Sequence, residues 1–83
     1  MSQDTFVNRI VKDKFYQGIG NRIFAERKRL GWSREKLADE SILSVETVRK
    51  AEQAESCSVL VLTRIATALD VMCDTLVPIG SES

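Results

Sequence analysis

The sequence predicts an all-α domain of five short helices preceded by an extra N-terminal helix. Apolar residues recur three and four positions apart along most of the chain, which is the spacing of one helix face. A serine hydroxyl that can cap the first turn of a helix stands before three such segments, at Ser33, Ser44 and Ser58. A chain of 83 residues, 43% of them apolar, allows one domain with a modest core.

Residues 1–17 are predicted to form a helical extension ahead of the main domain. Apolar residues at helical spacing are Phe6, Val7, Ile10, Val11 and Phe15. We therefore expect an amphipathic helix from Asp4 to Tyr16. Gly18 and Gly20 are expected to separate it from the next helix. Its apolar face either covers the domain's own core or pairs with a second subunit, and the first alternative is favoured because small domains need every apolar face they can bury.

The next helix is expected to run from Ile19 to Leu30. These two residues and Ile23 form its apolar stripe, and Arg27 falls within the stripe. A buried charge is costly unless it is paired, so Arg27 needs an acidic partner inside the domain. Trp32 follows this helix and is interpreted as a core-filling side chain rather than a base-stacking one.

The segment from Ser33 to Glu52 is interpreted as two short helices joined by a tight turn at residues 41–43. Such a short connection brings the helices into contact at a steep angle, which the small side chain of Ala38 permits. The inward positions of the two helices are Leu37, Ala38, Val48, Ala51 and Glu52. Because Arg27 and Glu52 are the two charges on inward faces, we expect them to form a structural ion pair.

Two further helices are expected, from Val59 to Leu69 and from Val71 to Val77, with Pro78 ending the last one. The main domain then covers residues 18–78, and residues 79–83 form a mobile polar tail. This region holds more apolar residues than one core face requires, namely Leu60, Val61, Met72, Val77 and Ile79. The surplus suits a twofold dimer.

The residues from Ile19 to Val77 resemble the phage repressor and Cro family, also called the XRE family. The residues that match its pattern, in order and without a gap, are Arg27, Gly31, Trp32, Ser33, Leu37, Ala38, Ser44, Val48, Glu52, Ala66, Ala68 and Leu69. The resemblance implies a lambda-repressor-like fold, the ion pair of Arg27 with Glu52, and a helix-turn-helix whose second helix lies in the major groove of DNA.

The resemblance also implies roles on DNA for the exposed residues of the motif. Bases would be read by Val45, Glu46, Arg49 and Lys50, and phosphates would be contacted by Ser33, Arg34 and Thr47. Valine can pack on a thymine methyl group, a carboxylate can accept from cytosine N4, and arginine or lysine can donate to guanine. Arg34 stands where the family commonly has glutamine, so a pairing with Glu46 is an alternative to a phosphate contact.

Three features depart from the family pattern. Ile42 replaces the glycine of the turn, where a β-branched residue would be strained in the left-handed conformation, which favours a remodelled turn. Ala54, Glu55, Ser56 and Cys57 replace a glycine and basic residues after the second helix, which lowers the expected phosphate affinity. Glu46 adds an acid to the reading face. Contacts with DNA are therefore expected to be few and sensitive to salt.

Charge is distributed unevenly along this chain, whose net charge is zero. Residues 1–36 carry nine basic and four acidic residues, a net charge of +5, whereas residues 37–83 carry three and eight, a net charge of −5. The basic half includes Arg27, Lys28, Arg29, Arg34 and Lys36. Such a basic face is compatible with phosphate contacts, although a solvated surface gives the same counts.

Composition favours a binding protein over an enzyme. The chain has no histidine, no glycine-rich phosphate loop and no CxxC spacing, so we expect no catalytic site, cofactor or metal, and we expect Cys57 and Cys73 to stay reduced. The sequence lacks a membrane-spanning apolar run and a signal peptide, which predicts a cytoplasmic protein without a membrane partner.

The predicted function is a sequence-specific transcriptional regulator, in the favoured form a repressor, that binds an inverted-repeat operator in double-stranded DNA as a homodimer. The alternative is a protein-binding module on the same fold, such as an antitoxin or a partner-binding subunit. An acidic loop and zero net charge fit this alternative.

Overall fold

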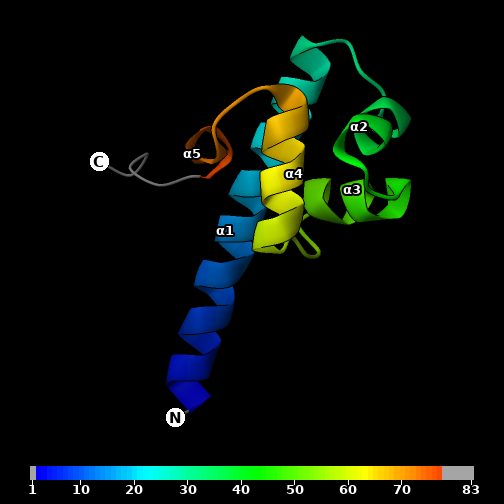
Figure 1. Ribbon diagram of the computed structural model, residues 1–83. Helices are drawn as coiled ribbons and strands as arrows, with labels where there is room; N and C mark the ends of the chain where they lie inside the picture. The colour runs from blue at the N-terminus through cyan, green and yellow to red at the C-terminus, as the bar shows by residue number, and fades with distance from the viewer. Residues whose placement is uncertain (1, 78–83) are drawn as a thin grey trace.

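The computed structural model describes the backbone of residues 2–77 and the side chains of residues 14–77. This part of the chain folds into helices joined by turns, and the all-α prediction is confirmed. The helices are α1 Ser2–Arg29, α2 Arg34–Ser41, α3 Val45–Glu52, α4 Val59–Leu69 and α5 Cys73–Leu76. Helices α1 and α4 lie in the middle, with α2 and α3 on one side and α5 on the other (Figure 1).

Helix α1 is one continuous helix of 28 residues, and the expected break at Gly18 and Gly20 is wrong. At Gly20, α1 packs closely against the end of α3. A Cβ atom at this position would lie 2.4 Å from the backbone oxygen of Glu52 and 2.8 Å from that of Ala51. A glycine inside a helix costs only about 1 kcal/mol relative to alanine. The close approach of α1 to the end of α3 therefore explains this glycine better than a break in the helix does.

The N-terminal half of α1 extends beyond the other helices (Figure 1). The side chains of Phe6, Val7, Ile10 and Val11, which were expected to form an apolar face there, lie outside the described residues. Phe15 is 39% exposed and meets Tyr16 edge to face, with ring centres 6.1 Å apart. Tyr16 packs against the core, so the described part of this segment contributes one aromatic ring to the domain.

The core gathers buried apolar side chains from all five helices. Its members are Ile19, Ile23, Leu37, Ala38, Val48, Ala51, Ile65, Ala66, Leu69 and Leu76. The four apolar positions expected to face inward from α2 and α3 are all among them. Trp32 packs against this cluster, and the Nζ atom of Lys36 lies 5.6 Å from the centre of its ring.

Helix α4 has the expected bounds, but α5 is shorter than predicted. Ser58 caps α4 by accepting a hydrogen bond from the backbone N–H of Val61 at 3.2 Å. Asp70 ends α4 in the left-handed conformation, and the N–H of Val71 donates back to the oxygen of Ala66 at 3.0 Å. Val71 thus follows α4 and closes its end, and α5 begins only at Cys73. Residues 78–83, with Pro78 and the predicted tail, lie outside the described residues.

The surplus apolar residues of this region that the structure describes are exposed or half-buried. Leu60 and Met72 are exposed, at 61% and 73%, whereas Val61 and Val77 are half-buried. Ile79 lies outside the described residues. Val59, at the start of α4, is also exposed, at 81%.

Candidate nucleic-acid interface

Helices α2 and α3 each begin with a serine that fixes the first turn. The Oγ atom of Ser33 accepts from the backbone N–H of Lys36 at 3.0 Å, and the Oγ atom of Ser44 accepts from that of Thr47 at 3.1 Å. The hydroxyl groups of Ser44 and Thr47 also lie 2.8 Å apart. These bonds satisfy backbone N–H donors that the first turn of a helix otherwise leaves without a partner. The residue at which each of the two helices begins is therefore set by its own capping serine.

The turn between α2 and α3 keeps the left-handed residue of the family pattern. Ile42 has φ 58° and ψ 48°, and its side chain is 78% exposed, so the expected remodelling does not occur. The backbone N–H of Leu43 donates to the oxygen of Ala38 at 2.9 Å, which closes the end of α2. From α4, Arg64 donates to the oxygen of Ile42 at 3.1 Å. The packed motif thus imposes the conformation on a β-branched residue.

Replacing Ile42 by glycine is expected to raise the free energy of unfolding by about 1 kcal/mol. The left-handed conformation costs an L-residue about 1–2 kcal/mol, and the greater backbone entropy of glycine in the unfolded chain offsets part of the gain. Urea unfolding followed by circular dichroism measures the change. Ile42→Ala is the control, since it removes the exposed side-chain atoms but keeps Cβ. Equal stabilities of the two variants would locate the effect in the side chain instead of the backbone.

A buried carboxylate lies where α1, α2 and α3 meet. The side chain of Glu52 is 2% exposed, and its two oxygens accept from Nε and Nη2 of Arg27 at 2.6 and 3.1 Å. Arg27, whose side chain is 8% exposed, also donates to the backbone oxygen of Trp32 at 2.8 Å. Arg34 adds a second cation, with its Nε atom 3.0 Å from Glu52. The three side chains fix the end of α3 to the end of α1 and the start of α2.

The structure places the three residues predicted to contact phosphate on the exposed side of the motif, with different roles. Ser33 is the cap of α2, and the hydroxyl of Thr47 is engaged with Ser44. Arg34 pairs with Glu52 and not with Glu46, and its side chain remains 32% exposed. Its hydrogen bond to the Glu52 carboxylate is made through Nε.

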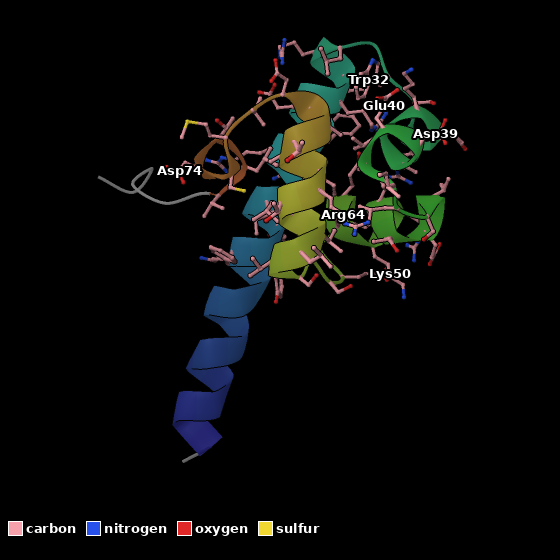
Figure 2. All side chains as sticks on the ribbon, viewed as in Figure 1. Trp32, Asp39, Glu40, Lys50, Arg64 and Asp74 are labelled. Atoms are coloured by element: carbon pink, nitrogen blue, oxygen red, sulfur yellow. The ribbon has the colours of Figure 1, made fainter. Side chains whose placement is uncertain are left out.

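The four residues predicted to read bases all lie on α3, and none of them is among its buried residues. Val45 is 39% exposed, the side chain of Glu46 is 60% exposed, and Lys50 is exposed (Figure 2). Arg49 differs from them because its side chain is only 28% exposed and lies between two glutamates, Glu46 and Glu55. The face that α3 offers to a partner therefore combines one apolar, one acidic and one unpaired basic side chain among the described residues.

Hydrogen bonds shift the pKa values of the charged side chains around Arg49. The guanidinium of Arg49, chiefly through its hydrogen bonds, lowers the pKa of Glu46 and that of Glu55 below their ordinary value. The same bonds raise the pKa of Arg49. Both carboxylates are thus ionised at neutral pH and act only as hydrogen-bond acceptors. A partner that meets Glu46 must offer a donor.

Sequence reasoning missed three contacts of this region. The close packing of Gly20 was read as a helix break, the pairing of Arg34 with Glu52 was not foreseen, and Glu55 was treated only as a lost phosphate contact. Glu55 stands six positions after Arg49, a separation that no regular helix brings into contact. Only the turn after α3 joins them.

The described residues hold no cluster of three side chains suited to bind a metal ion. Cys57 and Cys73 are free, and burial raises the pKa of the Cys57 thiol. None of the described helices is long and apolar enough to span a membrane.

Comparison with protein families agrees with this geometry. The HTH_3 helix-turn-helix family matches residues 23–75, which include α2, the turn, α3 and α4. The chain belongs to the HTH_3 helix-turn-helix family. It is accordingly a DNA-binding domain of the XRE type, and membership in this family of regulators confirms the expectation of a protein that is not an enzyme. A search of curated protein sequences gave no match.

Solved structures of helix-turn-helix proteins are also similar. The restriction-modification controller protein C.AhdI from Aeromonas hydrophila is 31% identical, with a TM-score of 0.70, over 74% of this chain and 94% of that one. The competence regulator ComR from Streptococcus vestibularis is 35% identical, with a TM-score of 0.67, over 74% of this chain and 21% of that one.

A third structure supports the fold alone. An HTH_3 family transcriptional regulator from Vibrio cholerae is 24% identical, with a TM-score of 0.74, over 78% of this chain and 37% of that one. This helix-turn-helix domain thus spans nearly all of C.AhdI but less than half of the Vibrio and Streptococcus chains.

Proposed function

We propose that the protein is a sequence-specific regulator of transcription, acting as a repressor, that binds an inverted-repeat operator with α3 in the major groove. The observation that carries this proposal is the division of α3 into two faces. Its inner face is fixed by buried side chains and by the Glu52 carboxylate, while Val45, Glu46 and Lys50 are exposed on the outer one. A helix held in this way can present side chains to base edges at a defined angle.

A homodimer would supply the affinity that one domain lacks. The reading face has one unpaired cation among the described residues, Lys50, so a single domain would neutralise few phosphates. Two domains related by a twofold axis would place their α3 helices in successive major grooves, about 34 Å apart. Val59 and Leu60 at the start of α4, and Met72 beyond its end, are exposed apolar side chains that a dimer interface could cover.

The similarity to C.AhdI, described as a restriction-modification controller protein, supports a regulatory role. Binding across a promoter would block the polymerase, and the protein would act in the cytoplasm together with its DNA. The competing function, recognition of a protein partner through α3, is favoured by the two acids beside Arg49 and by the zero net charge.

Selection of bound sequences from a random duplex pool tests the proposal. We would run the selection at two salt concentrations and record the mass of the protein in solution. Enrichment of an inverted repeat by a dimer is expected. A folded protein that enriches no sequence at low salt would instead support the protein-binding function.

Lys50→Ala is expected to lower affinity for the selected operator by about tenfold or more, since a specific contact to a base contributes about 1–3 kcal/mol of discrimination. The preference at one base pair of each half-site should relax as well. Lys14→Ala, which removes an exposed lysine from the N-terminal half of α1, is the matched control and should retain the native preference. Titration of labelled duplexes measures both. Equal losses in the two variants would show that charge alone, and not base contact, explains the effect.

A further inference from the structure

All hydrogen-bond donors of the Arg49 side chain are engaged within the protein. Its Nε atom donates to Oε1 of Glu46 at 2.9 Å, and Nη2 donates to Oε2 of the same residue. Nη1 donates to the side-chain oxygen of Gln53 and, at 3.0 Å, to Oε2 of Glu55. Nη2 also donates to Oε1 of Glu55 at 3.3 Å. A guanidinium has five N–H donors in total, and five bonds are formed.

This arrangement differs from that of an arginine that reads DNA. Direct reading of guanine needs two parallel N–H donors directed at O6 and N7. To supply two such donors, Arg49 would have to give up its hydrogen bonds to Glu46, to Glu55 or to both. Any glutamate that it released would then be an uncompensated acid beside the phosphates. The carboxylate of Glu46, in contrast, keeps lone pairs for a further donor, because each of its oxygens accepts only one bond from Arg49.

The loop after α3 is built to hold Glu55 in place. Ala54 adopts the left-handed conformation with φ 65°, which turns the chain back toward α3. The backbone N–H groups of Glu55 and Ser56 then donate to the oxygen of Lys50, at 2.9 and 3.4 Å. These hydrogen bonds fix the backbone at Glu55, and the carboxylate itself is held by its contacts with Arg49.

We propose that Arg49 and Glu55 are positioning residues that determine base preference by holding the Glu46 carboxylate on the reading face, and that Glu46 accepts a hydrogen bond from N4 of cytosine. This inference rests on the proposed function. Arg49 also offsets part of the repulsion between Glu46 and phosphate, so that an acid can lie in the groove. Glu55 acts through Arg49 and touches no base.

Parallel selections from a random duplex pool test the inference. The native protein is compared with Glu46→Gln, Arg49→Ala, Arg49→Lys and Glu55→Gln. Asp74→Asn is the control for loss of one acid, because Asp74 lies on α5, on the side of the molecule away from α3 (Figure 2). Circular dichroism establishes that each variant is folded, and Glu55→Gln keeps the shape of the side chain.

We expect three variants to relax the preference at the same base pair of each half-site: Glu46→Gln, Arg49→Ala and Glu55→Gln. The preference should fall by about tenfold in Glu46→Gln and in Arg49→Ala. Arg49→Lys should restore part of it, since an ammonium group can hold one carboxylate but not span two. Asp74→Asn should retain the native preference.

Two results would overturn the inference while leaving the proposed function intact. One is that Arg49→Ala relaxes a guanine preference at a base pair that Glu46→Gln leaves unchanged, which would make Arg49 a direct reader. The other is that Glu55→Gln behaves like Asp74→Asn. If the native protein enriches no sequence, the proposed function is overturned, and this inference with it.

Discussion

Replacing Glu52 by alanine is expected to lower the free energy of unfolding by about 3–5 kcal/mol, the usual cost of removing one partner from a buried ion pair. Removal of the carboxylate leaves Arg27 buried without an anion, and Arg34 loses its anionic partner as well. Small domains are stable by only about 5–15 kcal/mol. The variant should therefore unfold at a much lower urea concentration than the native protein, as followed by circular dichroism.

The other members of this cluster should rank below Glu52. Arg27→Ala leaves a buried carboxylate that Arg34 still compensates in part, so the loss should be smaller, and Arg34→Ala should cost least because that side chain is 32% exposed. Glu40→Ala is the matched control, since Glu40 forms an exposed pair with Lys36. Such a pair contributes at most about 1 kcal/mol. If Glu52→Ala cost no more than Glu40→Ala, the carboxylate would have to be solvated.

Alanine at position 20 is expected to destabilise the protein even though it is the better helix former. Its Cβ atom would overlap the backbone oxygen of Glu52, an atom that cannot rotate away, so α1 and α3 must separate. Overpacking of this kind typically costs about 1–3 kcal/mol. Because α3 would shift, binding to the selected operator should weaken together with stability. Urea unfolding and duplex titration measure the two effects.

Ala25→Gly calibrates the propensity term for Gly20→Ala. Ala25 is an exposed residue of the same helix, so its replacement by glycine should cost about 1 kcal/mol through propensity alone. If Gly20→Ala stabilised the protein by a similar amount, propensity would govern position 20 and the close contact with α3 would be absent.

Local signals predicted the helices from α2 to α4 well. A serine cap, an inward apolar pattern and a short connection lie within a few residues of one another, and each is a property of the nearby chain. These signals correctly predicted that Leu37, Ala38, Val48 and Ala51 are buried. The course of α1 could not be read in this way, because Gly20 is explained by a backbone 32 positions later in the sequence.

The surface of the site was also only partly predictable. Residue type and spacing identified the exposed positions of α3, since an amphipathic pattern separates the two faces of a helix. They could not show that Arg49 is engaged and Lys50 is not, because the partner Glu55 reaches Arg49 only through the turn at Ala54. The conformation at Ile42 was likewise decided by packing between α2, α3 and α4 rather than by the preference of isoleucine.

The division of α3 into two faces affects how the DNA target of such a protein could change during evolution. The residues that hold the helix, Val48, Ala51 and Glu52, are distinct from Val45 and Lys50, which are exposed. Mutations at the outer positions can therefore accumulate with little penalty for folding, and the domain can acquire a new target while its scaffold is inherited unchanged. Glu46 and Arg49 are the exception, since their mutual contact means that a change at one requires an adjustment at the other.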